Sequence, residues 1–110
     1  LGAGQRAKLV NNALVNAQIR LASDALAIGA QLGLDHDALA TVLRTGTGRS
    51  FGLEVVLGGR TIEELARTRS RVTITKDVEL IRAEVGDGPA DGLVRVAARL
   101  CRSLDEAAGR

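Results

Sequence analysis

Apolar side chains in the first third of the chain recur at the three-and-four spacing that is typical of one face of an α-helix. One row consists of Leu14, Ala17, Leu21, Ala25, Ile28 and Leu32, and a second row beside it consists of Val15, Ile19, Ala22, Leu26 and Ala30. No Pro interrupts residues 5–32, and helix-favouring Ala and Leu are abundant there. The pattern predicts one helix of roughly 40 Å that ends at Gly33 and buries both rows. Such a length suits a helix that forms the spine of an interface.

Capping residues and glycines predict three shorter helices next. Asp35 is placed as the N-cap of a helix that reaches about Arg44. Ser50 can cap a second helix, which ends at the glycine pair 58–59, and Thr61 opens a capping box for a third, which reaches about Arg67. The glycine-rich stretch 45–50 between the first two resembles a phosphate-binding loop only loosely, because it lacks the lysine of such loops. A flexible connector is the favoured interpretation.

The rest of the chain predicts two more helices. The β-branched alternation of residues 71–75 is also compatible with a strand, whereas Ile74, Val78, Ile81 and Val85 follow a helical period, which we favour. Residues 86–89 contain two glycines and the chain's one Pro, and they predict a break. A last amphipathic helix is marked by Leu93, Val94, Ala97, Leu100 and Leu104.

Composition agrees with packed helices in a single domain over residues 1–110. Hydrophobic residues make up 45% of the 110 residues and charged residues 25%, which is typical of a globular protein. Aromatic residues make up 1%, and a core of Ala, Leu, Val and Ile with so few aromatics favours an all-α fold over a sandwich or barrel. The chain begins with Leu1 rather than Met, so we expect it to come from a longer protein.

Charge and cysteine content exclude several classes of function. The formal net charge is +2, without a long basic run or aromatic stacking platforms, so nucleic-acid binding is not indicated. One Cys and one His give no cluster with metal-ligand spacing. The sequence shows no apolar stretch long enough to span a membrane and no leader pattern, so we expect a cytoplasmic protein without a membrane or metal partner.

Lys8 and Asn12 are the strongest candidates for chemistry. Their spacing puts both side chains on one face of the first helix, about one turn apart, where both can reach the same small ligand. The positive end of the helix dipole disfavours a nearby ammonium charge, which suits a lysine that gives and takes a proton. On spacing alone, ordinary surface residues remain the more common explanation of such a pair.

Three blocks in order resemble the C-terminal domain of the β-hydroxyacid dehydrogenase family. This family includes 3-hydroxyisobutyrate dehydrogenase, tartronate semialdehyde reductase and L-threonate dehydrogenase, and its fold resembles that of 6-phosphogluconate dehydrogenase-like enzymes. The blocks are Gly2-Ala3-Gly4-Gln5-Arg6-Ala7-Lys8-Leu9-Val10-Asn11-Asn12, then Gly48-Arg49-Ser50-Phe51, then Lys76-Asp77-Val78-Glu79-Leu80. The long helix through Ser23-Asp24-Ala25-Leu26 to Gly33 is also similar, although the family commonly has Glu at position 24 and an aromatic residue at position 69, which is Arg here.

The resemblance implies roles for four residues. The Lys matching Lys8 is the family's catalytic acid/base, the Asn matching Asn12 binds substrate, and the Lys matching Lys76 contacts the nicotinamide cofactor. Gly4 then belongs to the substrate site, where the missing Cβ lets a ligand approach the backbone. The implied enzyme transfers a hydride between a small 3-hydroxy acid and NAD or NADP.

The family's N-terminal Rossmann domain, which holds most of the cofactor, has no counterpart in this sequence. We therefore expect the 110-residue chain alone to be inactive. The missing domain and further copies of the chain in a homo-oligomer are its expected partners. The alternative from another class is a non-catalytic helical module, used only for dimerisation or binding.

Other polar residues favour plain structural interpretations. Arg67, Arg69 and Arg71 could meet a cofactor phosphate, but a solvated face is the more usual explanation of such alternation. His36 is expected at the surface without a catalytic task, and Cys101 in the core as a small hydrophobic residue.

Overall fold

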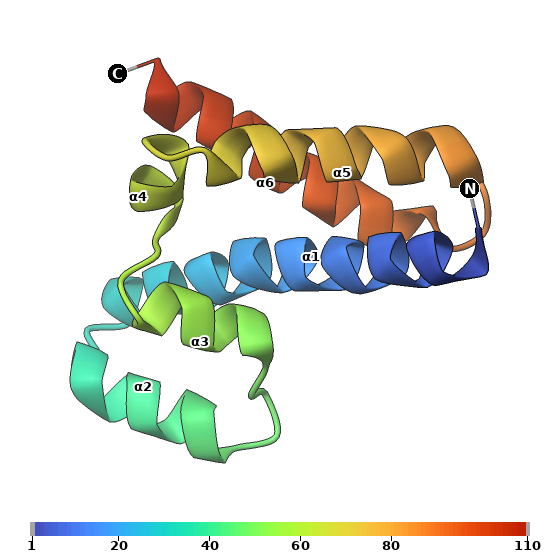
Figure 1. The fold of residues 1–110 in the computed structure, drawn as a ribbon. Helices are drawn as coiled ribbons and strands as arrows, with labels where there is room; N and C mark the ends of the chain where they lie inside the picture. Colours follow the sequence, from blue (N-terminus) through green and yellow to red (C-terminus); the bar gives the residue numbers. More distant parts are fainter. Residues whose placement is uncertain (1, 110) are drawn as a thin grey trace.

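The computed structural model describes residues 2–109; Leu1 and Arg110 lie outside the described part. The structure consists of six helices, and within residues 2–109 there is no strand, which confirms the all-α prediction. The helices are α1 (Ala3–Gln31), α2 (His36–Thr45), α3 (Phe51–Leu57), α4 (Ile62–Ala66), α5 (Ser70–Val85) and α6 (Asp91–Ala108), drawn in Figure 1.

The predicted caps begin the three short helices. The side chains of Asp35, Ser50 and Thr61 each accept a hydrogen bond from the backbone N–H three residues later, at 2.9, 3.0 and 3.3 Å. Gly33, with φ of +74°, follows the last turn of α1 in the left-handed conformation that glycine tolerates best. Local sequence signals therefore define where these helices start and stop.

The ambiguous residues 71–75 lie within α5, so the helical interpretation is confirmed. Ile74, Val78 and Ile81 are buried, whereas Val85, at the end of the same row, is 47% exposed. For α5, the helical spacing of the apolar residues is therefore a better predictor of secondary structure than the β-branched residues are.

Helix α1 is the spine of the molecule. In Figure 1, α5 and α6 lie along one side of α1, and α2 and α3 lie along the other. The larger core cluster joins α1 to α3, α4, α5 and α6; its buried members are Ile19, Ala22, Leu53, Val56, Ile62, Leu65, Ala66, Ile74, Val78, Ala97, Ala98, Leu100 and Leu104. A smaller cluster of Leu9, Ala13, Ile81 and Val94 closes the end near the start of α1.

The prediction that both apolar rows of α1 are buried is wrong for the large side chains of the first row, although Ala17 of that row is buried. Leu14, Leu21, Ile28 and Leu32 are 47%, 52%, 54% and 69% exposed. In the second row Ile19 and Ala22 are buried, whereas Ala30 is exposed. The reason is that the other five helices pack against part of the circumference of α1 and leave this stripe uncovered. The molecule is accordingly flat, with extents of 44 × 34 × 22 Å.

Candidate functional site

Lys8 and Asn12 lie in the first three turns of α1, one turn apart, as their spacing predicts. Lys8 is exposed, and Asn12 is half-buried where α1 meets α5. Asn12 therefore has a fixed place between two helices, and Lys8 stands beside it at the surface.

A hydrogen bond connects Asn12 to α5. The Asn12 side-chain amide Nδ2 donates to Asp77 Oδ2 at 3.0 Å, across 65 residues of sequence. The bond uses one N–H of the amide and leaves the amide oxygen and the second N–H for another partner. It brings the first and third sequence blocks together along one seam between α1 and α5. Sequence analysis gave Asp77 no role of its own, and its place directly after Lys76 in the third block was the available signal.

Lys76 precedes Asp77 on α5 and is exposed. Within residues 2–109, no carboxylate forms an ion pair with Lys8 or Lys76. Within this part of the chain, neither ammonium group is therefore neutralised by a carboxylate.

Gly4 lies in the first turn of α1 and is exposed. A Cβ added at Gly4 would meet no described atom of another part of the chain within 4 Å. Packing within residues 2–109 therefore gives no reason for glycine here. The prediction that a bound ligand approaches the backbone at Gly4 is therefore neither supported nor contradicted by this packing.

The second sequence block has a structural task. Ser50 caps α3, and the backbone N–H of Gly52 donates to Gln18 Oε1 on α1 at 2.9 Å. Within residues 45–50, Arg49 folds back to donate to the Gly46 carbonyl at 3.0 Å. These contacts agree with a connector that seats α3 on α1.

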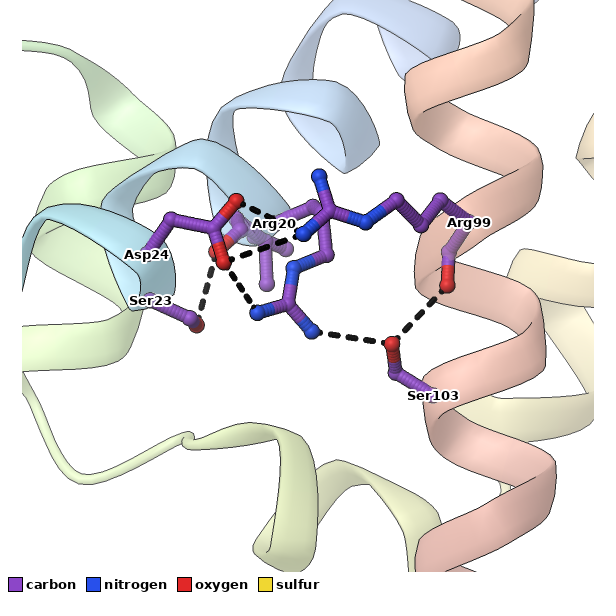
Figure 2. Close-up of polar contacts among 6 residues, drawn as sticks. Arg20, Ser23, Asp24, Arg99 and Ser103 are labelled. Atoms are coloured by element: carbon purple, nitrogen blue, oxygen red, sulfur yellow. Dashed lines mark hydrogen bonds and ion pairs between the residues drawn. The ribbon is translucent and has the colours of Figure 1, made fainter. Parts of the chain in front are cut away.

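An ion-pair cluster that sequence analysis missed joins α1 to α6 (Figure 2). Asp24 binds Arg20, one turn earlier, and Arg99 of α6, whose Nη2 lies 3.1 Å from Asp24 Oδ2; Arg20 also donates to Ser103 Oγ at 2.9 Å. Burial by itself raises the pKa of Asp24, but hydrogen bonds and charge from Arg20 and Arg99 outweigh it and hold this pKa below its ordinary value. The four-residue spacing of Arg20 and Asp24 was the signal in the sequence. The cluster fastens two helices and lies apart from Lys8 and Asn12 along α1.

The remaining polar residues have various surroundings. Arg67, which approaches Glu64 at 3.7 Å, is exposed, as expected of a solvated face, whereas Arg71 is half-buried and pairs with Asp105 at 2.9 Å. His36 is exposed, as predicted. Cys101 packs against the larger core cluster, and burial raises the pKa of its thiol.

The described residues form neither a metal-binding cluster nor a membrane-spanning helix. Among residues 2–109, no group of three or more His, Cys, Asp or Glu side chains is arranged to hold a metal ion. None of the described helices is both long and apolar enough to cross a membrane.

Comparison with known proteins places the chain in a family. A family model described as NAD-binding of NADP-dependent 3-hydroxyisobutyrate dehydrogenase matches residues 2–110. The chain belongs to this family. It is also similar to the L-threonate dehydrogenase of Cupriavidus necator, with 38% identity over 53 residues. That match covers 48% of this chain and 18% of the relative's length, and no solved structure matches the chain.

Membership of the 3-hydroxyisobutyrate dehydrogenase NAD-binding family confirms the resemblance to the β-hydroxyacid dehydrogenases and makes NAD or NADP the cofactor. By its chemistry, Lys76 of α5 fits such a group. Within residues 2–109 its ammonium forms no ion pair, and the carboxamide, ribose and phosphate oxygens of a nicotinamide cofactor all accept hydrogen bonds from ammonium groups.

Proposed function

We propose that residues 1–110 form the C-terminal helical domain of an enzyme that oxidises a small 3-hydroxy acid with NAD or NADP. Family membership supports the class of enzyme. The observation that carries the proposal is the hydrogen bond from Asn12 to Asp77 at 3.0 Å. It joins the helix that carries Lys8 and Asn12 to the helix that carries Lys76, although Lys76 is far from the other two in sequence.

Each residue at the seam has a proposed task. Bound NAD or NADP supplies the acceptor for the hydride that leaves the carbon of the substrate alcohol. Lys8, in its neutral form, takes the hydroxyl proton, so that the alcohol becomes a carbonyl as the hydride departs. Asn12 holds the substrate with the amide atoms that Asp77 leaves free, and Gly4 gives the substrate room beside the backbone. Lys76 contacts the cofactor.

The proposal includes partners for both sides of α1. A Rossmann domain elsewhere in the protein supplies most of the cofactor site. The exposed stripe of α1 (Leu14, Leu21, Ile28 and Leu32) meets a second copy of the chain. At 3.6 residues per turn, this stripe lies roughly opposite Lys8 and Asn12, so that dimerisation leaves the site open. A cytoplasmic location stays a prediction.

Substitution of Lys8 in the full-length enzyme tests the proposal. Lys8→Ala is expected to lower kcat by about two to four orders of magnitude, the usual effect of losing a general acid/base, with little change in cofactor affinity. Lys8→Arg is the sharper test, because arginine keeps the positive charge but cannot release a proton near neutral pH. The measurement is the rate of reduced cofactor formation from 3-hydroxy acids. Arg6→Gln, on the same exposed turn, is the matched control and should keep wild-type kcat.

Near-normal kcat in Lys8→Arg would overturn the proton-transfer role. The alternative, a non-catalytic helical module for dimerisation, is favoured by the exposed stripe of α1 alone. Under that alternative, the full-length protein reduces no cofactor with any hydroxy acid, whereas substitutions in the stripe still change its oligomeric state.

A further inference from the structure

A pocket adjoins the proposed site and has no task in the reaction described so far. It has a volume of about 340 Å³ and is lined by residues of α1, α3, α4 and α5 and of the segments before and after α4. Its wall on α1 includes Val15 and its wall on α5 includes Ile74, while Phe51, which is 69% exposed, stands at the start of α3. Most of the lining is therefore apolar.

Two arginines give the pocket a positive charge. Arg60 and Arg69 line it, and no acidic residue does. Arg60 Nη2 donates to Ser70 Oγ at 2.9 Å, which holds this guanidinium near the hydroxyl of another lining residue. Within residues 2–109, neither Arg60 nor Arg69 forms an ion pair, in contrast to Arg71, which pairs with Asp105 at 2.9 Å.

The pocket and the proposed site share two helix faces. Val15 follows Asn12 by three residues on α1, a rise of about 4.5 Å, and Thr73 of the pocket precedes Asp77 by four residues on α5, a rise of about 6 Å. Since Asn12 binds Asp77, these rises place the pocket about one helical turn from their hydrogen bond. A ligand held by Asn12 can extend into it.

We propose that this pocket receives the far end of the substrate, and that this end carries a second anionic group. The inference rests on the proposed function, because it assumes that the reacting end lies at Lys8 and Asn12. The apolar wall suits a short hydrocarbon stem, and arginine binds carboxylate or phosphate oxygens through two parallel N–H groups. Arg60 and Arg69 therefore select a hydroxy acid with an anionic terminus over one of the same length with a neutral terminus.

The test compares matched substrates in the full-length enzyme. Three 3-hydroxy acids of equal chain length end in a methyl group, a carboxylate or a phosphate monoester. We expect kcat/KM to be higher for at least one anionic terminus than for methyl, and the two anionic acids distinguish carboxylate from phosphate. Arg69→Gln should lower kcat/KM for the preferred anionic acid by about 10- to 100-fold, mainly through KM, because a charge-assisted hydrogen bond is lost.

Control variants separate the inference from the proposed function. Arg69→Gln should leave kcat/KM for the methyl-ended acid within about twofold, and Arg67→Gln, two residues away and outside the pocket, should leave all three substrates unchanged. Direct binding of the preferred acid to the Lys8→Ala enzyme should weaken by the same factor when Arg69→Gln is added. A preference for the methyl-ended acid, or equal effects of Arg69→Gln on all three acids, would overturn the inference while the role of Lys8 stands. Failure of every hydroxy acid to react would instead overturn the proposed function.

Discussion

At the scale of residues, the chain uses polar side chains to fix where α1 meets its neighbours. Asn12 binds Asp77 of α5 near one end of α1, and Asp24 binds Arg99 of α6 nearer the other. In both contacts a partly buried polar group binds a charged partner. Such directional contacts fix the relative position of two helices more closely than apolar packing alone does. The first contact includes Asn12 of the proposed site, and the second holds α1, which carries that site, against α6.

The Asp24 cluster predicts a dependence of stability on pH. The pKa of Asp24 lies below its ordinary value in the folded protein, so the ionised carboxylate stabilises the fold above the unfolded-state pKa, and this contribution is lost as pH falls through the folded pKa. Asp24→Asn should lower the free energy of unfolding at pH 7 by about 1–2 kcal/mol. The difference from wild type should shrink below about pH 4. Denaturant unfolding at several pH values measures both effects.

Asp87→Asn is the control for this experiment, because Asp87 is exposed and, within residues 2–109, belongs to no ion pair. It should change stability little at any of these pH values. A difference between Asp24→Asn and wild type that stays constant down to pH 2 would contradict the assigned role of the carboxylate.

At the scale of elements, the close approach of α3 to α1 depends on a glycine. A Cβ at Gly52 would lie 2.3 Å from Gln18 Cβ and 2.8 Å from the backbone of Gln18 and Ile19. These atoms are the backbone and Cβ of α1, which cannot rotate away as the end of a side chain can. A Cβ at Gly52 would therefore push α3 away from α1.

Gly52→Ala should therefore lower the free energy of unfolding by about 1–3 kcal/mol, the usual cost of overpacking. Gly92→Ala in α6 is the matched control, because a Cβ there meets no described atom within 4 Å. This substitution should be neutral or stabilise by up to about 1 kcal/mol, since alanine favours helices more than glycine does. Chemical denaturation compares the two variants, and equal stabilities would show that α3 does not sit this closely on α1.

At the scale of the whole molecule, the flat arrangement of helices leaves one side of α1 uncovered. The exposed stripe of α1 has the apolar character of a core but lies at the surface. Contiguous apolar surface of this kind marks an interaction site in soluble proteins, and a second copy of the chain covers it in the proposed dimer.

Leu21→Glu in the middle of the stripe should convert the dimer to a monomer, because it places a charge in the interface. Val72→Glu is the matched control, since Val72 is 66% exposed on α5, outside the stripe. This variant should keep the wild-type oligomeric state. Sedimentation velocity measures the oligomeric state of the wild type and both variants. A wild-type protein that stays monomeric at high concentration would contradict the proposed dimer.

Local sequence signals are enough to predict the helices and to place Lys8 and Asn12 one turn apart. Asp35, Ser50 and Thr61 cap helices, and Gly33 follows one, through contacts with residues a few positions away. The one-turn spacing of Lys8 and Asn12 follows equally from helix geometry. Such local interactions are encoded in short stretches of chain, so they can be predicted without knowing how the helices pack. The family resemblance was likewise readable from three short blocks.

Which surfaces are covered, and which distant residues meet, depends instead on how the helices pack. The two apolar rows of α1 look alike in the sequence, yet Ile19 is 3% exposed and Leu21 is 52% exposed, because burial depends on where the other helices lie. Periodicity reports that a side chain is apolar and not whether a neighbour covers it. The contact of Asn12 with Asp77, across 65 residues, and the pocket with Arg60 and Arg69 depend on the same packing of helices around α1.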